Sequence, residues 1–360
     1  MDIIQNALVE KDMIQNVIDN IEYNKTILFY YEKYAFEMHD DYKSTLINRR
    51  TSLELCNKFW VLDKYEMQKI KDLKSQNLCH DKFCSNCKKV KQAARMSKYI
   101  PELEKYSDKL HHLVLTQPNV PGAELQEMIK HMSKCFRQLI RYINSTDVIK
   151  GLDFSRWNYE GAVRSLEITY RDDMFHPHYH VGLIISPSTV SRKNISNIYS
   201  FDLRKGLPEL TRLFSEEEIL IQKIWYLLIN KIKVTKENID DLNEGYSCII
   251  DKFAPDEFAE LFKYMTKDKD EKGELLTYNQ FKTLYEALYR VKQIQGYGVL
   301  YRITDDLNME EFDALYKTLI EEIAKKESPA SVLEKPQELI LDSRYKVISR
   351  KSYFRYLRTL

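Results

Sequence analysis

The chain of 360 residues carries 55 Lys and Arg against 54 Asp and Glu, a formal net charge of +1, and 44% of its residues are hydrophobic. No apolar run approaches the roughly 18 residues that a membrane-spanning helix needs, and the N-terminus lacks a signal-peptide pattern, so we expect a cytoplasmic protein with no membrane partner. At about 150 residues per domain, the length predicts about two domains.

The N-terminal part, residues 1–75, is predicted to be mostly helical because it consists of long charged amphipathic stretches. Two basic segments stand out from the balanced composition. Residues 71–98 hold eight Lys and Arg, and residues 343–358 hold six with no acid. Basic segments suit contact with phosphates, and the tyrosines of the second segment suit stacking on bases. The alternative is that both are ordinary solvated helix faces.

Cysteines gather in the stretch CHDKFCSNC, which gives Cys79, Cys84 and Cys87 in C-x4-C-x2-C spacing, with Cys56 upstream. A cytoplasmic protein keeps its cysteines as thiols or metal ligands. Four thiolates can make a closed tetrahedral zinc site, so we predict a structural Zn site here. His80 is an alternative to Cys56 as the fourth ligand, and plain buried cysteines are an alternative to zinc. The remaining cysteines, Cys135 and Cys248, are expected in the core.

The central part of the chain alternates between strand and helix patterns. Strands joined by hairpins and interrupted by helices predict an α+β fold, a central antiparallel sheet flanked by helices. The predicted strands are 110–120, 161–170, 176–185 and 296–303, and the predicted helices are 122–145, 188–198, 216–233 and 255–268.

The strand HPHYHVGLII places His176, His178 and His180 at alternate positions. Side chains alternate between the two faces of a strand, so the three imidazoles share one face. Imidazoles in this arrangement can converge on one metal ion. Core histidines that bond to backbone are the alternative. Because both faces turn apolar after the last histidine, we expect this to be a central strand.

The preceding strand supplies an acidic ligand if Asp172 and Asp173 form a two-residue hairpin loop. Glu167 then lies directly opposite His178 and points to the same face. A slip of one residue would turn every side chain to the other face. Glu167 is therefore the predicted third ligand, and a surface glutamate on an exposed sheet face is the alternative.

A later helix, APDEFAELFKYMTKDKD, has a core-facing stripe at i, i+3, i+4, i+7 that begins at Phe258. Glu260 and Tyr264 are four residues apart and point out of the core, and Lys267 continues their row. A phenol with an ordinary pKa near 10 is a poor nucleophile at pH 7. A polarised phosphate and a nearby cation would compensate, so this row suits phosphoryl transfer. A solvated helix face is the alternative.

Taken in order, these segments resemble the rolling-circle replication initiators of small bacterial plasmids, members of the HUH endonuclease superfamily. HLVLTQPNV resembles their first motif, HPHYHVGLI the second and ELFKYMTK the third. CHDKFCSNCKKVK and LYEALYRVKQIQGYGVL resemble the segments that precede and close the domain. The resemblance covers about residues 56–303. It departs at Gly182, which interrupts the usual apolar run, and at Ser85, where the family often has proline.

The resemblance implies a role for each matching residue. His178 and His180 are the metal-binding pair, with Glu167 as the acidic ligand of a divalent ion, Mg or Mn. Tyr264 is the residue that attacks DNA, and Glu260 occupies the position of the acid used in termination. The implied activity is metal-dependent, strand-specific nicking at a double-strand origin through a 5′-phosphotyrosine, followed by strand closure. The implied partners are plasmid DNA and a host helicase and polymerase, and whether two copies form a homodimer stays open.

The expected domains are a helical N-terminal region with the cysteine cluster (1–100), a catalytic domain of the HUH type (101–303) and a helical, basic C-terminal segment (304–360). Three other functions remain open from the sequence. They are a relaxase or transposase with the same ion and tyrosine, a non-catalytic zinc-dependent DNA-binding regulator, and a metal hydrolase that uses water and leaves no covalent adduct.

Overall fold

The computed structural model describes residues 23–56, 59–62, 79–186, 215–242, 245–246, 248–253, 261–262, 274–303 and 346–349. The chain divides into two compact units. Unit 1 is Met1–Ser97 with Asp306–Leu360, and unit 2 is Lys98–Asp305. This division does not test the functions expected for residues 1–100, 101–303 and 304–360, which stay predictions.

Unit 1 is helical in its described N-terminal part, as the charge pattern predicted. Residues 23–37 form a helix, and α2 follows at Asp40–Cys56. A short strand, β1 (Phe59–Leu62), pairs antiparallel with β8 (Lys346–Ser349), so two segments far apart in the chain share a two-stranded sheet. The helix α3 (Ser85–Glu104) begins in unit 1, and its last residues belong to unit 2.

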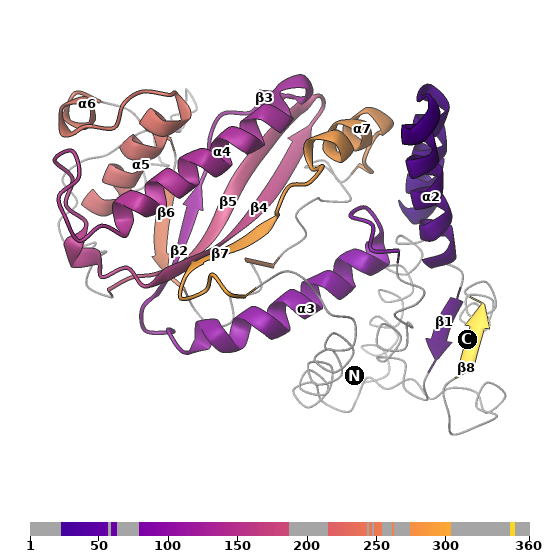
Figure 1. The fold of residues 1–360 in the computed structure, drawn as a ribbon, viewed down its shortest axis with the longest axis horizontal. Helices are drawn as coiled ribbons and strands as arrows, with labels where there is room; N and C mark the ends of the chain where they lie inside the picture. Colours follow the sequence, from indigo (N-terminus) through magenta and orange to yellow (C-terminus); the bar gives the residue numbers. More distant parts are fainter. Residues whose placement is uncertain are drawn as a thin grey trace, which may run out of the picture. The chain divides into compact units, whose positions relative to one another are not determined.

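The centre of unit 2 is an antiparallel sheet in the order β6-β2-β5-β4-β7, with the short β3 also pairing with β5 (Figure 1). The histidine strand β5 lies in the middle of this order, which confirms the prediction of a central strand and of the α+β class. The strands are β2 (Leu110–Leu115), β3 (Val120–Pro121), β4 (Gly161–Arg171), β5 (Met174–Ile184), β6 (Cys248–Lys252) and β7 (Ile294–Gly298).

The hairpin between β4 and β5 has the two-residue loop Asp172-Asp173 that the sequence predicted. Asp172 adopts a positive φ of 53°, which aspartate tolerates better than most residues. The side-chain amide of Gln280 donates a hydrogen bond of 2.9 Å to the carbonyl oxygen of Asp172. The predicted register follows, with Glu167 directly opposite His178.

Helices cover the face of the sheet that carries Tyr179. The ring of Tyr179 packs edge-on against Phe136 of α4, with 5.5 Å between centroids, and lies 6.4 Å from Trp225 of α5. The apolar residues that recur at helical spacing along α4 are buried: Leu125, Ile129, Met132, Phe136, Leu139, Ile140 and Ile143. The histidines alternate with Tyr179, so they face the opposite side. The helices of unit 2 are α4 (Gly122–Ile143), α5 (Glu216–Ile229), α6 (Lys236–Asp240) and α7 (Tyr278–Ala287).

Some predicted boundaries were wrong. The strand expected at 296–303 is β7, which ends at Gly298 because this glycine has φ +60° and the chain turns there, with the amide of Tyr301 bonded to its carbonyl. The sequence also missed β6 and α7. The helix expected at 188–198 lies outside the described residues, as does that at 255–268 except for 261–262. Cys135 and Cys248 are buried as expected.

Candidate metal and nicking site

The structure brings Glu167, His178 and His180 together on the face of the sheet opposite α4. The Nε2 atoms of His180 and His178 lie 3.0 and 3.3 Å from the same carboxylate oxygen of Glu167. The potential ligand atoms of the three residues all lie within 4.8 Å of one another. Glu167 and His178 are buried, whereas His180 is partly exposed. This cluster joins the two adjacent strands β4 and β5.

The second nitrogen of each imidazole is already engaged. Nδ1 of His178 lies 3.1 Å from the carbonyl oxygen of His176, to which its N–H donates. Nδ1 of His180 lies 3.1 Å from Nε2 of His112. Metal-binding histidines commonly hold their other nitrogen in this way, which fixes the ring orientation. Both Nε2 atoms are therefore directed to the point that Glu167 faces.

The donor set fits a divalent cation. Two imidazoles and one carboxylate suit metals such as manganese, and a set of three protein ligands leaves positions for substrate oxygen. His176, the first residue of the alternating run, stacks on His178 with 5.1 Å between ring centroids but does not belong to the three-residue cluster.

His112 is the site residue that sequence reasoning missed. Its ring stacks on that of His180 at 5.3 Å between centroids and lies 4.7 Å from the ring of Phe253. It stands on β2, opposite Gly182 of β5. The signal was present in LHHLVL, where alternation places one of the two histidines on the metal-facing side once the strand order is known.

The three residues proposed to act on DNA, Tyr264, Glu260 and Lys267, lie outside the described residues. Leu261, the described residue that follows Glu260 in sequence, lies against the metal-facing side. A Cβ atom built on Gly182 would lie only 3.1 Å from Cδ1 of Leu261. Glycine at this position therefore leaves room for Leu261, which gives a physical reason for the break in the apolar run after the histidines.

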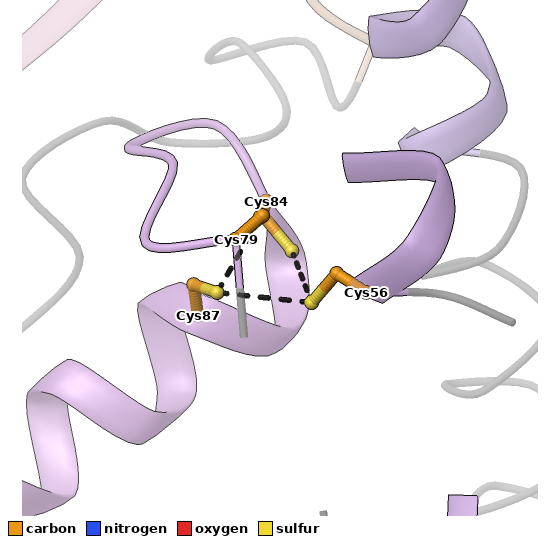
Figure 2. A group of neighbouring side chains, drawn as sticks. All are labelled: Cys56, Cys79, Cys84 and Cys87. Carbon is orange, nitrogen blue, oxygen red and sulfur yellow. Dashed lines mark hydrogen bonds between the residues drawn. The ribbon is translucent and has the colours of Figure 1, made fainter. Parts of the chain in front are cut away.

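The cysteine cluster lies wholly within unit 1. The sulfur atom of Cys56 lies 3.7 Å from that of Cys84 and 3.8 Å from that of Cys87, and the sulfur atoms of Cys79 and Cys87 are 3.6 Å apart (Figure 2). Four sulfurs around zinc at about 2.3 Å would be about 3.8 Å from one another in a tetrahedron. The spacing thus fits a tetrahedral ion, and the group contains Cys56 and not the alternative His80.

Buried hydrogen bonds hold the cysteine loop. The carboxylate of Asp81 accepts from Tyr31 Oη at 2.7 Å and from the backbone amide of Phe83 at 2.8 Å. The side-chain oxygen of Asn24 accepts from the amide of Ser85, the first residue of α3, at 3.0 Å. These contacts fix the loop against the helix at residues 23–37, so the cysteines are positioned by residues outside the motif.

The thiols of the cluster differ in acidity. Burial raises the pKa of Cys84, while hydrogen bonds from neighbouring thiols, Cys79 first, lower the pKa of Cys56. A cation at the centre would stabilise all four sulfurs as thiolates, because metal binding displaces the thiol protons.

Comparisons with known proteins agree with this picture. The sequence profile of a family described as "Replication protein" matches residues 70–199. "Protein rep" of Staphylococcus aureus is 36% identical over 194 residues, which cover 49% of this chain and 75% of that protein. "Protein rep" of Streptococcus pneumoniae serotype 2 (strain D39 / NCTC 7466) is 26% identical over 268 residues, covering 72% of this chain and 71% of that protein.

No solved structure matches the chain. Within the part of the chain that the structure describes, no helix combines the length and apolar character needed to cross a bilayer. The family match covers Cys79, Cys84 and Cys87 and the β4–β5 hairpin, and the alignment to the staphylococcal protein extends over three quarters of that relative. The predicted resemblance is confirmed: this chain belongs to the Rep family of plasmid replication initiators.

Proposed function

We propose that this initiator nicks plasmid DNA at its double-strand origin in the manner of an HUH endonuclease. The observation that carries the proposal is the convergence of His178, His180 and Glu167, with both Nε2 atoms within 3.3 Å of one carboxylate oxygen. A divalent ion, Mg or Mn, held by these three side chains would polarise the scissile phosphate.

Tyr264 supplies the nucleophile in this proposal. Its oxygen bonds to phosphorus as the bond to the 3′ oxygen breaks, which leaves a 5′-phosphotyrosine and a free 3′-OH. The phenolic proton passes to solvent or to a nearby base, and Lys267 offsets negative charge on the phosphate. The phosphotyrosine link conserves the energy of a phosphodiester, so strand closure needs no ATP.

Termination is assigned to Glu260, four residues from the tyrosine, as the general base that activates water for the second cleavage. The free 3′-OH primes a host polymerase, and a host helicase unwinds the duplex ahead of the polymerase. The cysteine cluster of unit 1 is proposed to hold a structural zinc ion.

Mass spectrometry of the protein after incubation with an origin oligonucleotide and Mn tests the nucleophile. We expect an adduct on Tyr264 that is lost in Tyr264→Phe and retained in Tyr289→Phe, a matched control at a tyrosine that is 53% exposed in the same unit. An adduct that survives Tyr264→Phe would overturn the assignment. DNA binding without any adduct would instead favour a non-catalytic regulator.

A further inference from the structure

A row of four basic residues follows the outer side of α4. Lys130, Lys134, Arg137 and Arg141 are spaced by four, three and four residues, so they lie along one side of the helix. All four are exposed. No acid occurs between Met128 and Ile143 of this helix, although the whole chain holds 55 basic and 54 acidic residues.

Glu127, three positions before Lys130, is the acid nearest to the row along α4. Among the described residues, none of the four forms a salt bridge, and Arg137 bonds only to the carbonyl oxygen of Ser133 in its own helix, at 3.3 Å. Lys130 and Lys134 form one like-charge i,i+4 pair and Arg137 and Arg141 another, which destabilises a helix. The row therefore costs some helix stability.

The helix dipole does not account for the row. Cations are favoured in the last turn of a helix, and only Arg141 lies in the last turn of α4. Lys130 and Lys134 stand near the middle of the helix, where this effect has faded. The positions of these basic residues are better explained by the binding of an external anion.

The loop that follows α5 adds positive charge on the same side. Lys231, just after α5, lines a hollow of about 520 Å³ together with Lys130 and Lys134. Glu124 and Glu127, near the start of α4, line the same hollow at its acidic end. Lys231 thus adds a further positive charge beside Lys130 and Lys134.

The geometry points to duplex DNA as the partner of this surface. We propose that the exposed side of α4 binds the phosphate backbone of double-stranded plasmid DNA, at a place other than the nick site. At about 1.5 Å per residue the row spans about 16 Å, which corresponds to about five phosphates along one strand. None of the exposed positions of α4 carries an aromatic side chain for stacking on bases, which disfavours single strands.

The position of α4 separates this contact from the cleavage chemistry. Phe136 of α4 packs on Tyr179, whose side chain points to the opposite face of β5 from His178 and His180. The phosphate held by α4 is then not the one at the metal cluster. The inference rests on plasmid DNA as substrate and assigns to α4 the task of holding flanking duplex.

Two matched double variants test this surface. Lys134→Gln/Arg137→Gln neutralises the middle of the row, and Arg290→Gln/Lys292→Gln removes one lysine and one arginine from the exposed loop between α7 and β7. Fluorescence anisotropy with labelled origin duplex over a range of NaCl concentrations gives the affinity and its salt dependence. For the α4 variant we expect a loss of roughly tenfold or more at 0.1 M salt and a slope of log K against log salt smaller by about 2.

Two further results complete the test. Covalent adduct formation on a short single-stranded nick-site oligonucleotide with Mn should be unchanged in the α4 variant, because that substrate does not reach α4. Equal loss of duplex affinity in both variants, or an unchanged slope in the α4 variant, would overturn the proposal. If wild type forms no adduct but the α4 variant alone loses duplex binding, the nicking proposal fails while this one stands.

Discussion

Nε2 of His112 lies 3.1 Å from Nδ1 of His180, with the two rings stacked at 5.3 Å between centroids. This contact directs Nε2 of His180 toward Glu167 and so prepares the ring for a metal ion. The strand β2 contributes no proposed metal ligand, but its residue His112 orients the proposed ligand His180.

Replacing His112 by Ala should weaken Mn binding by about 10- to 100-fold, because the orienting hydrogen bond is lost. His112→Gln, whose amide can still accept from Nδ1, should recover part of the affinity. Electron paramagnetic resonance titration with Mn measures both. His131→Ala, on α4 and away from the cluster, is the control, and equal affinity in His112→Ala and wild type would contradict the orienting role.

Glu167→Gln should abolish tight Mn binding while leaving the protein folded. The amide keeps the size of the carboxylate but removes the charge that a divalent ion requires. Isothermal titration calorimetry gives the affinity, and circular dichroism checks the fold. Glu160→Gln, just before β4 and paired with Lys109, is the control. Retained affinity in Glu167→Gln would exclude this side chain as a ligand.

Gly182→Val should destabilise unit 2 by about 1–3 kcal/mol, because a Cβ at this position already lies 3.1 Å from Leu261 and 3.3 Å from Val163. Urea unfolding measures the change. The double variant Gly182→Val/Leu261→Ala should lose less stability than the sum of the two single variants, since the smaller side chain relieves the contact. Strict additivity would show that the two positions do not interact.

Cys84→Ser should lower the zinc content and the unfolding temperature of unit 1, since a tetrahedral site loses one of four ligands. Metal analysis by mass spectrometry and thermal unfolding give the two readouts. Cys135→Ser, a buried cysteine outside the cluster, should keep its zinc. Zinc loss in both variants, or in neither, would contradict the four-cysteine site.

Burial lowers the pKa of His111 below its ordinary value of 6.5. The unfolded chain then binds a proton more readily than the folded protein, so the contribution of this residue is fully present above pH 6.5 and is lost as pH falls below that value. In urea unfolding between pH 8 and pH 5, His111→Gln should show a weaker acid loss of stability than wild type. Identical pH profiles of stability for His111→Gln and wild type would show that His111 does not cause the loss of stability in acid.

The sequence pattern predicted the β4–β5 hairpin and the helix α4, because both depend on residues close together in the chain. Alternation and the Asp172-Asp173 turn were enough to place Glu167 opposite His178, because a two-residue loop fixes the register of a hairpin. The apolar stripe of α4 was likewise readable from its spacing.

Contacts between distant segments could not be predicted in the same way. The approach of His112 to His180 depends on β2 pairing with β5, 68 residues away, and nothing in either strand specifies that neighbour. The pairing of β1 with β8 is even less local. The space that Gly182 provides became clear only when Leu261 was seen to lie over it.

The pairing of β1 with β8 has a consequence for biosynthesis. Unit 2 is one continuous stretch, so it can fold as soon as Asp305 has left the ribosome. Unit 1 needs residues 346–349 to complete its two-stranded sheet and must wait until these residues have been synthesised. Premature termination shortly before these residues would then yield a polypeptide with unit 2 formed and the β1 edge uncovered, a species prone to self-association.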